Sequence, residues 1–150
     1  GYYLTARWHG SDEEEIAFAR ECVAHPEYGQ SVARELWYIH AERQTYGKLP
    51  LTYFAQPEVW ADIRASLSSY LEQNPHEIDT HMLYAYYAWL AHDWSTLIEQ
   101  LPETIPATFS MSPPITEEIY HQMLADAKAH GKDTRPPATA RTVTAAAVSP

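Results

Sequence analysis

The chain has 150 residues, 45% of them hydrophobic and 20% charged, with a net charge of −10 at pH 7. This length and composition are typical of one globular domain and exclude a disordered or fibrous chain. The ten Lys and Arg residues are scattered singly among twenty acidic ones. That pattern argues against binding to nucleic acid or to an anionic membrane, and it suits a basic protein or peptide as partner.

The only cysteine is Cys22. We therefore expect no intrachain disulfide and no thiolate metal cluster. We also expect no cofactor. No apolar run approaches the roughly 20 residues of a membrane span, and no signal peptide is recognisable, so the default expectation is a cytoplasmic protein without membrane insertion. Since the chain begins with Gly1 and not Met, it can be a piece of a longer protein.

The first two predicted helices span residues 12–24 and 30–46. Ser11 and Glu14 form a capping-box pattern before the first helix, and Pro26 ends it. Gly47 is the expected C-terminal stop of the second. Residues 48–56 form an apolar connector, which we expect to pack against the domain.

The third predicted helix begins at Pro57 and ends at Asn74-Pro75. Residues 75–102 then predict two helices joined by a tight turn, with Asp93 as the N-cap of the second and Pro102 as its stop. A sixth helix follows Thr116 and ends at Gly131. The segment 132–150 has few apolar residues, so we interpret it as a flexible or partner-bound tail.

These elements predict an all-α domain over residues 1–131, with about six helices in stacked antiparallel hairpins. The segment 75–102 resembles a tetratricopeptide-type repeat. Its small positions match Ala85 and Ala88, and its turn matches Asp93-Trp94, whereas His92 stands where that family prefers glycine. With no clean second copy at the ~34-residue period, the resemblance implies a degenerate member of that class.

A second resemblance lies in the N-terminal string Arg7-Trp8-His9-Gly10-Ser11, which precedes an acidic helix start and then Phe18-Ala19-Arg20. It is similar to the opening of an uncharacterised family of bacterial helical domains. This resemblance would cover residues 4–101 and implies a helical fold and a bacterial origin. It supplies no catalytic residues.

The candidates for chemistry are weak. His76 and His81 are five residues apart with Asp79 between them, whereas two histidines that bind zinc from one helix face are four apart. We therefore expect no catalytic or metal-binding residues. A hydrolase that uses His76, Asp79 and His81 is the enzymatic alternative.

We expect the aromatic residues to serve partner contacts, because Trp, Tyr and Arg dominate interface hot spots. We assign this role to Arg7 and Trp8 in the N-terminal string and to Tyr84, Tyr87 and Trp94 in the hairpin. The sequence thus predicts a non-catalytic interaction module, an adaptor or accessory subunit of a larger assembly. An immunity or inhibitor protein, whose acidic surface masks a basic toxin, is a further alternative; the oligomeric state stays unassigned.

Overall fold

Every regular element in the described part of the chain is a helix. The computed structural model describes residues 11–103 and 115–131, and within them the expected all-α fold is confirmed. The elements are α1 (Asp12–Ala24), η1 (Pro26–Tyr28), α2 (Gln30–Ala33), α3 (Glu35–Tyr46), η2 (Leu51–Ala55), α4 (Pro57–Gln73), α5 (Ile78–Leu90), α6 (Trp94–Gln100) and α7 (Glu117–Gly131), where η marks a 3-10 helix. Arg7, Trp8 and the tail from residue 132 lie outside the described residues.

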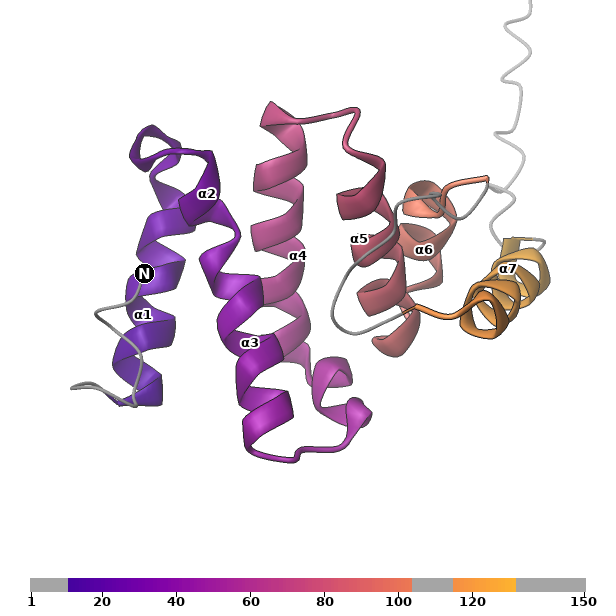
Figure 1. Ribbon diagram of the computed structural model, residues 1–150, viewed down its shortest axis with the longest axis horizontal. Helices are drawn as coiled ribbons and strands as arrows, with labels where there is room; N and C mark the ends of the chain where they lie inside the picture. The colour runs from indigo at the N-terminus through magenta and orange to yellow at the C-terminus, as the bar shows by residue number, and fades with distance from the viewer. Residues whose placement is uncertain (1–10, 104–114, 132–150) are drawn as a thin grey trace, which may run out of the picture.

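The helices follow one another across the molecule in chain order, from α1 at one end to α7 at the other (Figure 1). Successive helices pack together, most extensively α5 with α6 and α3 with α4, which agrees with stacked hairpins. The main hydrophobic core lies among α3, η2, α4, α5, α6 and α7, and a smaller cluster joins α1 to α3. Helix α5 is buried along most of its length, including the small residues Ala85 and Ala88.

The caps that the sequence predicts are present. Ser11 and Glu14 form both bonds of the capping box at α1, and the Asp93 carboxylate accepts from the Thr96 amide at the start of α6. His92, in the turn between α5 and α6, has a φ of +60°. Glycine adopts this left-handed conformation more readily than histidine does, since a side chain there is strained.

The single helix expected over residues 30–46 is wrong, because the structure divides it at Arg34 into α2 and α3. The Ser66 hydroxyl of α4 donates to the Ala33 carbonyl (2.5 Å) and accepts from the Trp37 amide (3.2 Å). These two backbone groups are four residues apart, so an uninterrupted helix would bond them to each other. The Ser66 side chain has therefore inserted into the backbone hydrogen bonds of this segment and bent the helix.

The connector over residues 48–56 packs against the domain, as expected. It contains η2, in which Tyr53 and Phe54 are buried. Gly47 ends α3, and a Cβ atom at this position would lie 2.6 Å from the Arg43 carbonyl oxygen, so the close approach requires glycine. None of the described helices has both the length and the apolar character of a membrane-spanning helix.

Because the Ser66 hydroxyl bonds both α2 and α3, we predict that removing it lowers the stability of the fold. Ser66→Ala leaves the Ala33 carbonyl and the Trp37 amide without their partner, so the free energy of unfolding should fall by about 1–3 kcal/mol in urea denaturation. Ser68→Ala is the matched control, because the Ser68 hydroxyl bonds to the Arg64 carbonyl of its own helix. Its effect should stay within about 0.5 kcal/mol. Equal stability of the two variants would show that α2 and α3 can close the bond themselves.

Candidate functional site

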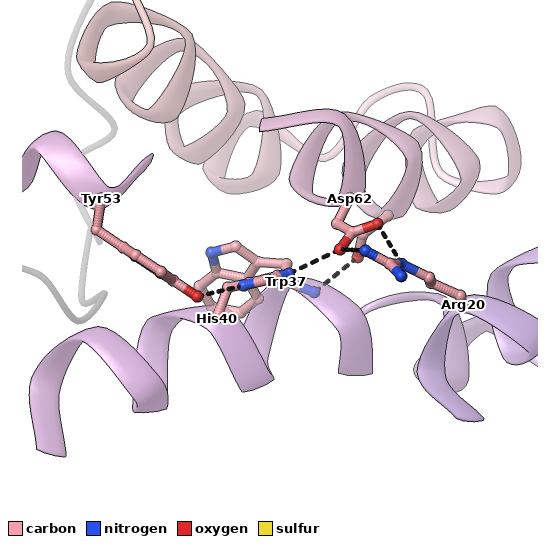
Figure 2. A network of polar contacts seen from close by, with 6 residues as sticks. Arg20, Trp37, His40, Tyr53 and Asp62 are labelled. Carbon is pink, nitrogen blue, oxygen red and sulfur yellow. Dashed lines mark hydrogen bonds and ion pairs between the residues drawn. The ribbon is translucent and has the colours of Figure 1, made fainter. Parts of the chain in front are cut away.

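A chain of polar side chains crosses the interior from α1 through α4 and α3 to η2 (Figure 2). Arg20 of α1 donates two parallel hydrogen bonds to the Asp62 carboxylate of α4, from Nε to Oδ1 and from Nη2 to Oδ2, each 2.8 Å long. Bidentate arginine–carboxylate pairs are among the strongest charge-assisted hydrogen bonds in proteins. The pair therefore fixes the first helix of the stack to the fourth.

His40 of α3 continues the chain. Its Nε2 lies 3.0 Å from Asp62 Oδ2, and its Nδ1 lies 2.8 Å from the Tyr53 hydroxyl. A neutral imidazole satisfies both contacts, since the proton on Nε2 is donated to Asp62 while Nδ1 accepts from Tyr53. Burial lowers the pKa of His40, although Asp62 opposes part of this effect.

The Asp62 carboxylate is ionised. Burial raises its pKa, but the hydrogen bonds from Arg20 and His40 together lower it by more, and the net direction is downward. A charge-paired Asp–His–Tyr chain could serve acid–base chemistry if a substrate reached it. However, His40 is only 2% exposed and both of its ring nitrogens are engaged. The arrangement is that of a structural link and not of an open active site.

The histidines that the sequence offered for hydrolysis are not assembled into a centre. His81 places Nδ1 2.7 Å from the Gln100 side-chain oxygen and Nε2 2.9 Å from the Pro75 carbonyl oxygen. The described residues show no hydrogen bond or ion pair among His76, Asp79 and His81. Across the same part of the chain, no group of three or more His, Cys, Asp or Glu side chains could hold a metal ion.

The aromatic residues assigned to partner binding in the hairpin lie mostly in the core. Tyr84 is 5% exposed and Tyr87 is 1% exposed, so neither ring stands on the outer surface as the sequence suggested, because α5 is covered on both sides. Trp94 is half-buried, and its ring stacks on that of His130 at 4.1 Å between centroids. Arg7 and Trp8 lie outside the described residues.

An aromatic pocket, which sequence reasoning missed, opens between α3, η2 and α5. It has a volume of about 220 Å³, and its buried lining comprises Trp37, Phe54 and Tyr87. The Phe54 and Tyr87 rings meet edge to face with centroids 4.8 Å apart, and Trp37 meets Tyr87 at 6.3 Å. Burial raises the pKa of Tyr87, while the nearby Trp37 indole acts in the opposite direction. The indole nitrogen itself has no hydrogen-bond partner of good geometry within the described residues.

The rim of the aromatic pocket is exposed. Tyr38 is 49% exposed, Tyr46 is 62% exposed and Leu51 is 49% exposed. Glu42 also lines the pocket and accepts a 3.2 Å bond from the Tyr38 hydroxyl. Tyr38, Glu42 and Tyr46 are four residues apart, so they share one face of α3. That spacing is the sequence signal by which this surface could have been found.

Comparison of the chain with protein-family models, with curated proteins and with solved structures finds no match. The family resemblances of the hairpin and of the N-terminal string therefore remain expectations.

The buried network predicts a specific pH dependence. The pKa of His40 is lower in the folded state than its unfolded value of about 6.5, so the unfolded state binds the proton first as the pH falls. Stability should therefore decrease between pH 8 and pH 5. The lowered pKa of Asp62 adds a further loss only below about pH 4.

Urea denaturation at pH 8, 6.5 and 5 measures this dependence. His40→Gln should flatten the fall in the free energy of unfolding over this range, whereas His76→Gln, a change of an exposed histidine, should leave it unchanged. An identical slope in the wild type and in His40→Gln would contradict the assignment of the titration to His40.

Proposed function

We propose that this chain is a non-catalytic interaction module that binds another protein or peptide, as an adaptor or accessory subunit, through the aromatic pocket and its rim. The observation that carries the proposal is the exposed set of Tyr38, Tyr46 and Leu51 above a buried aromatic floor. Tyrosine at a surface supplies a large apolar contact area and a polar tip at low entropic cost, which is why it is enriched in interfaces.

The helical scaffold supports the same proposal. Stacked helical hairpins of the tetratricopeptide type hold extended surfaces for binding partners. In this chain the polar cluster around Asp62 and His40 is enclosed and satisfied, whereas the aromatic pocket has exposed residues on its rim. A site that offers apolar area and no free reactive group favours recognition over catalysis.

The proposal predicts that partner capture depends on the rim. In affinity purification from native lysate with quantitative mass spectrometry, the double variant Tyr38→Ser/Tyr46→Ser should lose the captured partner by about tenfold or more, because truncating aromatic hot spots typically costs more than 1–2 kcal/mol. The double variant Phe18→Ser/Tyr28→Ser is the matched control, since both residues are similarly exposed but lie on α1 and η1.

The control variant should retain the partner, and circular dichroism should show that both variants keep the wild-type helix content. If the rim variant captures the partner as well as the wild type does, the pocket is not the binding site. If only the control variant loses it, the interface lies on α1 and η1 instead.

A further inference from the structure

Among the described residues that line the aromatic pocket, Glu42 is the one that carries a charge. Its carboxylate accepts from the Tyr38 hydroxyl, and within the described residues no Lys, Arg or His side chain lies within ion-pair distance of it. Arg43, the next residue along the chain, pairs with Asp12 at 3.5 Å instead. The rim thus holds a carboxylate whose charge no cation of the described residues balances.

This charge restricts what can occupy the pocket. An apolar side chain that covered the rim would remove water from the Glu42 carboxylate and supply no hydrogen bond or charge in its place. Burying an unpaired charge in this way costs free energy of binding. An anionic group would be repelled directly. A cation offsets the desolvation through its charge, and it also gains from the faces of Trp and Tyr rings, whose quadrupole attracts positive charge. The combination of aromatic rings and one carboxylate therefore favours a cation.

Among protein side chains, arginine fits these features best. Its guanidinium is planar, stacks on aromatic rings, pairs with a carboxylate through a fixed fork of donors and is more weakly hydrated than an ammonium group. The molecule already contains such a contact, since the Arg34 guanidinium lies 5.6 Å from the centroid of Trp37 and 5.0 Å from that of Tyr70. The net charge of −10 would also attract a basic partner segment during encounter.

We propose that the aromatic pocket receives an arginine side chain from a basic segment of a partner protein, with the guanidinium paired to Glu42 and held between the rim tyrosines. This inference rests on the proposed function and adds the chemistry of the partner to it. The arginine stem would lie against the apolar floor, while the segment that carries it would run across α3 and η2.

The test uses the full chain and two blocked pentapeptides, Gly-Ala-Arg-Ala-Gly and the same peptide with citrulline, the neutral isostere of arginine, in place of arginine. Titration followed by ¹H–¹⁵N NMR should show shifts confined to the α3 and η2 residues that line the pocket. The arginine peptide should bind about tenfold more tightly than the citrulline peptide, because only it supplies cation–π attraction and an ion pair. Its affinity should fall as salt is raised.

Two variants test whether Glu42 is the carboxylate that pairs with the arginine of the peptide. Glu42→Gln should weaken binding of the arginine peptide about threefold to fivefold and leave the citrulline peptide unchanged, in line with measured energies of exposed ion pairs. Glu72→Gln removes an exposed glutamate of α4 and should change neither affinity. Equal effects of the two substitutions would overturn the pairing with Glu42.

The outcomes separate this inference from the proposed function. If both peptides bind the pocket equally, the preference for a cation is wrong while the pocket remains a docking site. If neither peptide shifts the pocket residues at about 20 mM, the arginine inference is overturned. In that case the proposed function stands if Tyr38→Ser/Tyr46→Ser still loses its partner, and it falls as well if that variant captures the partner normally.

Discussion

The Asp62 side chain is 10% exposed within a stack of helices, and an ionised group at that depth is tolerated only when donors surround it. Arg20 supplies two of those donors from α1, and His40 supplies a third from α3. Removing either partner would leave buried charge without compensation. The positions of α1, α3 and α4 relative to one another therefore depend on this one carboxylate, in a region where the apolar cluster between α1 and α3 is small.

The same network reaches the aromatic pocket through the connector between α3 and α4. The Tyr53 hydroxyl donates a hydrogen bond to His40. Phe54, which follows Tyr53 in the chain, forms part of the pocket floor. Because η2 is a single short 3-10 helix, fixing Tyr53 also fixes Phe54 and Leu51. The buried polar chain thus holds one wall of the pocket in place, and the uninterrupted helix α3 supplies the other. A rigid wall of this kind limits the entropy that a bound segment would cost.

The buried polar side chains and the exposed aromatic side chains form two separate groups in this molecule. Asp62, His40 and Tyr53 are enclosed and already bonded to each other. By contrast, Tyr38, Tyr46 and Leu51 are exposed on the rim of the pocket, beside the half-buried carboxylate of Glu42. Our proposals of partner binding and of arginine recognition both follow from this separation. They differ in what they need, since the first needs only the apolar area and the second needs the Glu42 charge.

The local elements could be predicted from the sequence because their signals are local. Prolines, the Ser11–Glu14 capping box and the Asp93 cap act within a few residues of chain, so five of the six predicted α-helices agree with the structure. The 3-10 helices η1 and η2 were not predicted. The break at Arg34 could not be predicted, because its cause is Ser66, which belongs to a different helix. For the same reason, the burial of Tyr84 and Tyr87 and the contacts among His40, Asp62 and Arg20 could not be predicted. The i, i+4, i+8 spacing of Tyr38, Glu42 and Tyr46 can be read from the sequence, but the pocket beneath them could not be predicted from it. Burial and hydrogen bonding between distant segments exist only once the helices pack, and that is why the tertiary structure alone decided where the site lies.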